Sequence, residues 1–264
     1  LPKTGSTLMS ALQPIDLLGV QPSQQFAFFP FAASTYNQID GETNYRVGTD
    51  IFWRPSTNMQ LTATLNPDFG AIESDDVVVN LTAFETFFAE KRIFFLEGSE
   101  IFITTPRSNP PERLSGGSSV GARRSPSSFQ PEPTTLVNTR RIGGPAVDPD
   151  IEGITIPNVQ LGAPTELIGA AKLTGQSGVW RYGVLAAFEE DTRFHGTDDV
   201  TGDNVVIEQT GRDFGILRFL YEDATNGRRS IGWISTLTSH ETQDAYVHGV
   251  DLHYQTPNRS WNWD

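Results

Sequence analysis

The chain of 264 residues carries a formal net charge of −13 and contains no cysteine. The acidic balance disfavours a nucleic-acid partner, because phosphate binding needs clustered Lys and Arg. Without thiols, disulfides and thiolate metal sites are excluded. No apolar run reaches the length of a transmembrane helix, so a β-barrel is the one membrane-spanning fold that the sequence leaves open.

Alternation of apolar and polar residues with a period of two dominates the chain and predicts an all-β fold. The alternating runs cover 46–53, 59–65, 180–188, 214–220, 231–237 and 246–254. Turn residues bound them at Pro55–Asn58 and at Asn226–Gly227, the strongest hairpin signal in the chain. Each run lasts about ten residues, the length that a tilted strand needs to cross a bilayer.

One face of these runs carries aliphatic and aromatic residues, and the other carries Gly, Thr, Ser and some charge. Aromatic residues stand near several run ends, at Trp53, Trp180, Phe188, Tyr221 and Tyr254. Both features fit an antiparallel up-and-down transmembrane barrel with a wet lumen and an interfacial aromatic girdle. A soluble β-sandwich would show the same alternation, and the pattern alone does not separate the two folds.

The Phe/acid segment, residues 67–103, interrupts this alternation. Its phenylalanines predict packing against a wall or a partner, at Phe69, Phe84, Phe87, Phe88, Phe94 and Phe95. Charged residues are interleaved with them, and buried charges must be paired. We therefore expect a plug in the barrel lumen or an insert at the periplasmic mouth, held by a mixed-sign network of Asp68, Glu73, Glu85, Glu90, Lys91, Arg92, Glu97, Arg140 and Arg141.

The chain divides into four parts on this pattern. Residues 1–23 form a lead-in, 24–66 the first barrel strands, 67–164 an insert with long loops, and 165–264 a run of barrel hairpins. The loops are expected at 104–135 and 143–164, which are rich in Gly and Pro. Only 77–92 could offer a short helix.

Few residues suggest chemistry of their own. A calcium site from Asp68, Glu73, Asp75 and Asp76 is a candidate, but the spacing does not fit an EF-hand, and a solvated loop or an ion-pair role is the preferred interpretation. His248 and His253 are five residues apart, so they lie on opposite faces of a strand and do not form a metal site together. We expect no cofactor.

Paired carboxylates could serve glycoside hydrolysis, with Glu85 and Glu90 or Glu97 and Glu100 as the candidates. Carboxylates are so numerous here that such pairs arise by chance. Catalysis is therefore not the expected function.

The stretch from Leu65 to Gly98, which includes Asn66-Pro67-Asp68-Phe69-Gly70 and Glu90-Lys91-Arg92, resembles a bacterial family of uncharacterised proteins. In that family a family-9-like carbohydrate-binding module precedes a predicted outer-membrane β-barrel. Shorter stretches at 140–143, 168–175 and 182–185 continue the resemblance. The family supplies no established activity and no catalytic residues.

The resemblance implies a protein of the bacterial outer membrane that contacts lipid and acts as a channel, a plugged pore or an anchor in an assembly with other envelope proteins. The strands counted in the sequence lead us to expect only part of a barrel, completed by further residues or other chains. The alternative is a soluble β-sandwich that binds glycan, with Trp53, Trp233 and Trp261 stacking on sugar rings, or a glycoside-active enzyme of the envelope.

Overall fold

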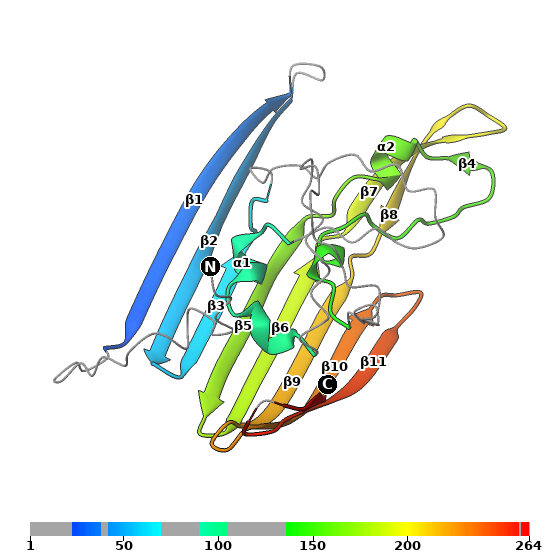
Figure 1. Ribbon diagram of the computed structural model, residues 1–264. Helices are drawn as coiled ribbons and strands as arrows, with labels where there is room; N and C mark the ends of the chain where they lie inside the picture. The colour runs from blue at the N-terminus through cyan, green and yellow to red at the C-terminus, as the bar shows by residue number, and fades with distance from the viewer. Residues whose placement is uncertain (1–22, 38–41, 70–89, 105–135, 259, 264) are drawn as a thin grey trace, which may run out of the picture.

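The computed structural model describes residues 23–37, 42–69, 90–104, 136–258 and 260–263. They form two antiparallel sheets with few helical residues, so the predicted all-β class is confirmed (Figure 1). The larger sheet has nine strands, in the spatial order β1 (Gln25–Asn37), β2 (Glu42–Ser56), β3 (Met59–Leu65), β5 (Leu167–Ser177), β6 (Trp180–Glu189), β9 (Asp213–Asp223), β10 (Arg228–Ser239), β11 (Ala245–Gln255) and β12 (Asn262–Trp263).

The smaller sheet comprises β4 (Ile154–Thr155), β7 (Thr192–Asp198) and β8 (Asn204–Gln209). Its main hairpin, β7–β8, interrupts the hairpins expected over 165–264. Because β6 pairs directly with β9, this hairpin leaves the nine-stranded sheet and projects beyond its end (Figure 1).

The nine-stranded sheet is open. β1 and β12 are its two edges, and the strands in the described part of the chain do not close into a barrel.

The two ends of the sheet are joined differently. At one end the connections are short, at 57–58, 178–179 and 224–227. The expected hairpin turns are confirmed here, and Gly227 adopts a φ of +85°, which favours glycine. At the other end stand the long connections, 66–166 and 190–212, together with 38–41 and 240–244.

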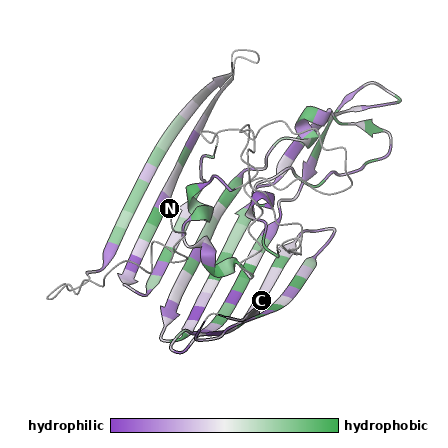
Figure 2. Cartoon of the chain, viewed as in Figure 1, coloured by the Kyte–Doolittle hydropathy of each residue, from purple (hydrophilic) through white to green (hydrophobic). Residues whose placement is uncertain are grey.

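The two faces of the sheet also differ, and the hydropathy of the residues alternates along the long strands (Figure 2). In β9, Phe214, Ile216, Arg218 and Leu220 are buried, while the residues between them are exposed or half-buried. We call the first face the covered face, because the insert packs on it, and the second the open face.

The insert supplies four short helical turns, α1 (Ile93–Leu96), η2 (Ser99–Phe102), η3 (Thr139–Arg141) and α2 (Asn158–Leu161). Phe94, Phe95, Ile101 and Phe102 from the first two turns form one apolar cluster with buried residues of β5, β6, β9 and β10. The covered face closely fits this cluster at Gly183, because a Cβ there would lie 2.9 Å from Ile101 Cγ2.

Among the residues described, none of the helices has the length and hydropathy that a bilayer crossing requires. The short helix expected over 77–92 falls mostly outside the described residues.

Candidate functional site

The candidate site is the contact between the insert and the covered face. Charged side chains of β2, β5, β6, β9 and β11, which we call the wall strands, meet the insert there, and several of them bind its main chain. The alternation of the strands places these side chains, because each points to the face opposite the exposed aliphatic and aromatic residues.

Lys172 of β5 is 2% exposed and is directed at the end of α1. Its ammonium donates hydrogen bonds to the main-chain oxygens of Phe94 and Glu97. The last carbonyls of a helix have no partner inside the helix, so a cation at this position satisfies them. Lys172 also lies over the ring of Phe94, with 5.1 Å from Nζ to the centroid.

Arg218 of β9 and Asp251 of β11 form a bidentate ion pair across β10, with Nη2 2.7 Å from Oδ2. Arg218 is 1% exposed, and its Nε donates to the main-chain oxygen of Ile101 in η2. His253 Nε2 lies 2.9 Å from Asp251 Oδ2 and 2.9 Å from the main-chain oxygen of Thr104. This triad therefore holds the insert at two main-chain oxygens.

Gly232 makes the ion pair of this triad possible. It lies on β10 between the two partner strands, and a Cβ there would come 2.5 Å from Arg218 Nη1 and 2.6 Å from Asp251 Oδ1. Any larger residue would have to push the guanidinium and the carboxylate apart.

Ser230 lies opposite His253 in the β10–β11 register, and its hydroxyl has no hydrogen-bond partner among the described residues. With Asp251, these are the residue types of a nucleophilic triad. All three side chains are buried, and His253 Nε2 already contacts both Asp251 and the Thr104 oxygen. The three side chains are enclosed in the structure, and His253 contacts the insert at the Thr104 oxygen.

A second group of contacts binds the insert to itself. Arg92 donates to both carboxylate oxygens of Glu90, each at 2.8 Å, and to the main-chain oxygens of Thr139 and Ile142. The Thr139 hydroxyl also donates to Glu90. The guanidinium stacks over the Phe95 ring, with 4.2 Å from Cζ to the centroid. Through this ion pair, Arg92 and Glu90 contact residues that lie about 50 positions later in the chain.

Two opposing effects act on the pKa of Glu90. Burial alone would raise it, but the hydrogen bond and positive charge of Arg92 and the hydroxyl of Thr139 outweigh burial and lower the pKa below its ordinary value. The carboxylate is therefore ionised at neutral pH and stabilises Arg92.

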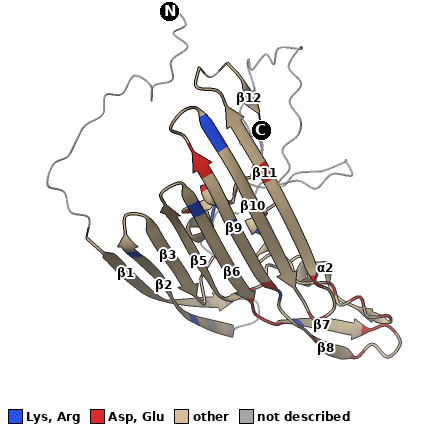
Figure 3. Cartoon of the chain, turned by 90° about the horizontal axis from the view of Figure 1, so that it is seen from below, with Lys and Arg blue, Asp and Glu red and all other residues tan. Residues whose placement is uncertain are grey.

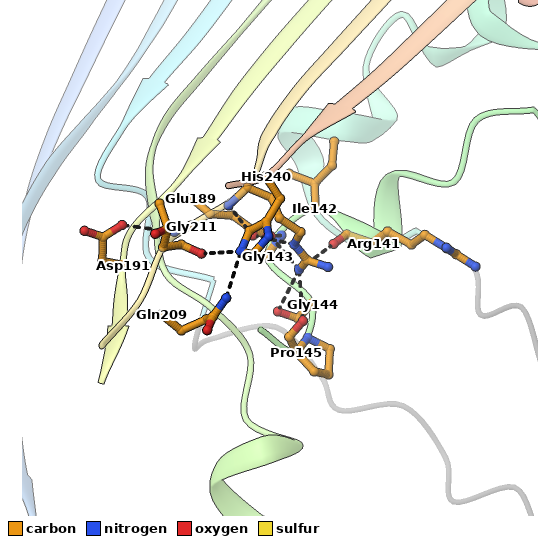
Figure 4. A network of polar contacts seen from close by, with 12 residues as sticks. Arg141, Ile142, Gly143, Gly144, Pro145, Glu189, Asp191, Gln209, Gly211 and His240 are labelled. Atoms are coloured by element: carbon orange, nitrogen blue, oxygen red, sulfur yellow. Dashed lines mark hydrogen bonds and ion pairs between the residues drawn. The ribbon is translucent and has the colours of Figure 1, made fainter. Parts of the chain in front are cut away.

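A third group of contacts holds the later part of the insert at the long-connection end (Figure 4). The buried carboxylate of Glu189 accepts from the main-chain nitrogen of Gly143 at 2.8 Å and pairs with Arg212 at 2.7 Å. Arg212 also donates to the main-chain oxygen of Pro145. Beside this group, Gln209 Nε2 lies 2.9 Å from His240 Nε2.

The structure brings together part of the predicted charge network. Glu90 pairs with Arg92, and Glu97 pairs with Arg54 of β2 at 2.7 Å. The other described members, Asp68, Lys91, Arg140 and Arg141, each take part in a further polar, ring or electrostatic contact. Glu73 and Glu85 lie outside the described residues.

Of the phenylalanines predicted to pack, Phe94 and Phe95 are buried in the cluster and Phe69 contacts it. Phe84, Phe87 and Phe88 lie outside the described residues.

Three members of the calcium candidate, Glu73, Asp75 and Asp76, also lie outside the described residues. Within the described part of the chain, no three His, Asp or Glu side chains are grouped to hold a metal ion. His248 and His253 are on opposite faces as expected, with His248 stacked on Trp233 of the open face at 6.3 Å between ring centroids.

The sequence analysis did not identify the wall residues of the site, Lys172, Glu189, Arg212, Arg218 and Asp251. A usable signal existed for three of them. Lys172, Arg218 and Asp251 are single charges that interrupt otherwise uncharged stretches of about seven or more residues, and Arg218 stands in register with the apolar Phe214, Ile216 and Leu220.

A model of the family described as Domain of unknown function (DUF5916) matches residues 22–105. The match spans β1 to β3, α1 and η2, so it covers the most specific part of the resemblance. It brings no link to a carbohydrate-binding module or to an outer-membrane barrel family, and the later stretches at 140–143 and 168–185 lie outside it. No curated protein and no solved structure matches the chain.

Proposed function

We propose that the chain forms part of the wall of a bacterial outer-membrane β-barrel, with the insert as a plug on its inner side. The observation that supports this proposal is the open face of the sheet. Between the strand ends it carries no Asp, Glu, Lys or Arg from β2 to β11. Its side chains include Val47, Ile51, Trp53, Leu61, Leu173, Val184, Leu217, Phe219, Trp233, Val250 and Leu252.

A surface of this kind is costly in water. Leu217, Phe219 and Val250 are 42%, 51% and 69% exposed, and monomeric soluble proteins rarely leave so broad an apolar surface uncovered. Lipid removes the cost, because hydrocarbon solvates aliphatic and aromatic side chains well. Figure 3 shows that the long strands carry few charged residues and that acidic residues gather near β7 and β8.

Strand length and aromatic placement support the same proposal. β5, β6, β9, β10 and β11 have 10 to 12 residues, and a tilted strand needs about 9–11 to cross the hydrocarbon core. Next to the short turns, Trp180 packs edge-on against Tyr221 at 5.2 Å, and Tyr254 pairs with Trp263. Aromatic residues favour the membrane–water interface.

The unequal ends of the sheet suggest an orientation. In outer-membrane barrels short turns face the periplasm and long loops face the outside. The insert follows β3 at the long-connection end. It would therefore enter the lumen from the extracellular side and would not be the periplasmic insert that we considered as one alternative.

Among a channel, a plugged pore and an anchor, the contacts of the insert favour the plugged pore. Lys172, Arg218 and His253 all bind its main chain under a closed apolar cluster. An open channel would leave these wall charges to water. The partners that follow from the proposal are outer-membrane lipid and any strands that pair with the free edges of β1 and β12.

The proposal is tested by placing a charge on the open face. Leu217→Arg puts a cation near the middle of β9, and Val200→Arg places the same charge on the β7–β8 turn, where Val200 is 90% exposed. If lipid covers the open face, Leu217→Arg destabilises the inserted protein by about 2–4 kcal/mol and reduces its yield in the outer-membrane fraction, while Val200→Arg has no effect.

Recovery of the wild-type chain from cells without detergent contradicts the proposal, as does equal tolerance of both variants. In either case the soluble glycan-binding alternative is favoured. That alternative requires that a glycan column retains the wild-type chain and that Trp233→Ala abolishes the retention.

A further inference from the structure

A cavity lies between the insert and the wall, at the short-turn end of the sheet. Its volume is about 470 Å³, within the range typical of small-molecule sites. The lining residues come from β1, β2, β3, β5, the start of β6, η2, and the chain just before β1 and between β2 and β3. The lining consists of Ser23, Gln25, Arg54, Ser56, Thr57, Asn58, Met59, Gln60, Glu100, Ile101, Thr174, Gly175, Gln176 and Arg181.

The chemistry of the lining is unlike that of the apolar cluster beside it. Apart from Met59, Ile101 and Gly175, every lining residue has a hydrogen-bonding side chain, and no aromatic ring takes part. Three of these residues carry charge, namely Arg54 and Arg181 on the wall and Glu100 on the insert. Opposite charges therefore come from opposite sides of the cavity.

Existing contacts set how much of each charge is available. Arg54 is paired with Glu97 at 2.7 Å and with the Gln60 amide, and its side chain remains 49% exposed. Arg181 is held loosely by Glu222, at 3.3 Å, and Glu222 also binds Arg228 at 2.7 Å. Because Glu222 serves two arginines, the charge of Arg181 is only partly neutralised.

Glu100 differs from these arginines. It is exposed, and it interacts electrostatically with the buried Lys172. The Lys172 ammonium donates to the main-chain oxygens of Phe94 and Glu97, and Glu100 lines the cavity, where its carboxylate can accept from a ligand cation.

We propose that this cavity binds a short zwitterionic peptide. Its ammonium would pair with Glu100 and its carboxylate with Arg181, while the amides of Asn58, Gln60 and Gln176 would hydrogen-bond its main chain. A phosphate-bearing ligand fits less well, because the negative charge of Glu100 in the same cavity repels it. A sugar lacks the aromatic platform that sugar rings stack on.

The proposal is tested by calorimetric titration of the detergent-solubilised full chain with trialanine. The matched ligand is N-acetyl-trialanine amide, which has the same main chain and no terminal charges, and maltotriose serves as the sugar. We expect trialanine to bind and the capped peptide to bind at least about tenfold more weakly, since a charge-assisted hydrogen bond contributes more than the 1.4 kcal/mol that a factor of ten requires.

Two variants then assign the charges. Glu100→Gln and Arg181→Gln should each weaken trialanine about tenfold or more and leave the capped peptide unchanged. Glu208→Gln, on the exposed β8 away from the cavity, is the control and should change nothing. Circular dichroism checks that each variant is folded. Arg181→Lys keeps the positive charge and should retain part of the affinity for trialanine.

Absence of trialanine binding to the folded wild-type chain overturns the proposal. Equal affinity for the capped peptide also overturns it, and so does tighter binding of maltotriose. None of these measurements depends on a bilayer. If the peptide proposal is overturned, the membrane proposal is unaffected, and if the chain does not insert into membranes, the peptide proposal is unaffected.

Discussion

On the covered face of the sheet, Lys172, Arg218 and Asp251 are all buried, whereas on the open face Leu217 and Val250 are exposed. A water-soluble sheet places its charges outward and its aliphatic residues inward. Here the same strands bury these charges on one face and expose aliphatic residues on the other. On the covered face the buried charges stand beside the apolar cluster, and the insert supplies the main-chain oxygens that bind Lys172 and Arg218.

The largest expected effect of a substitution is at the buried Arg218–Asp251 ion pair of the covered face. Arg218→Met leaves Asp251 without its bidentate partner in a dry contact, which we expect to cost about 3–5 kcal/mol in the free energy of unfolding. The measurement is urea unfolding in detergent, followed by tryptophan fluorescence.

The exposed pair of Arg193 and Glu208, 2.9 Å apart, provides the matched control. Arg193→Met should cost at most about 1 kcal/mol, because water screens this pair. Similar losses for the two variants would mean that the covered face is wet.

Adding one methyl group to a glycine on each face compares how tightly the two faces are packed. Gly232→Ala, on the covered face, drives a Cβ into the Arg218–Asp251 pair and should cost about 1–3 kcal/mol through overpacking. Gly215→Ala, on the open face, meets nothing closer than the Leu237 Cβ at 3.7 Å. We expect it to be tolerated, and unfolding of both variants side by side gives the difference.

The smallest expected effect is the loss of stability at low pH. The pKa of Glu90 is lowered in the folded chain, so its stabilising contribution is complete above the pKa of an unfolded glutamate, about 4.3, and is lost as the pH falls through the folded value. Unfolding midpoints measured from pH 7 down to pH 3 should fall less steeply in Glu90→Gln than in the wild type. Parallel curves would place the acid-sensitive group elsewhere.

Local patterns were sufficient to predict several elements of the fold. The alternation identified β2, β3, β6, β9, β10 and β11, because burial on one face imposes a period of two, and Asn226–Gly227 marked its turn correctly. Phe94 and Phe95 were predicted to pack, and they do. The β7–β8 hairpin was not separated from the sheet, since its alternation resembles that of its neighbours and only the direct pairing of β6 with β9 excludes it.

The charge network was harder to predict for a different reason. Arg92 binds main-chain oxygens near position 140, and no side-chain pattern reveals a main-chain acceptor. The role of Gly232 likewise depends on the register of three strands. Pairings of this kind are fixed by tertiary structure, and the sequence shows only the residues that are available for them.

The wall holds the insert largely through main-chain atoms, since Lys172, Arg218 and His253 reach the oxygens of Phe94, Glu97, Ile101 and Thr104. Main-chain oxygens are the same whatever side chain they belong to. These hydrogen bonds therefore do not depend on which side chains the insert carries, provided that it follows the same path and fills the same apolar cluster. We therefore expect that a different insert sequence can be grafted onto the sheet while Lys172, Arg218 and His253 remain unchanged.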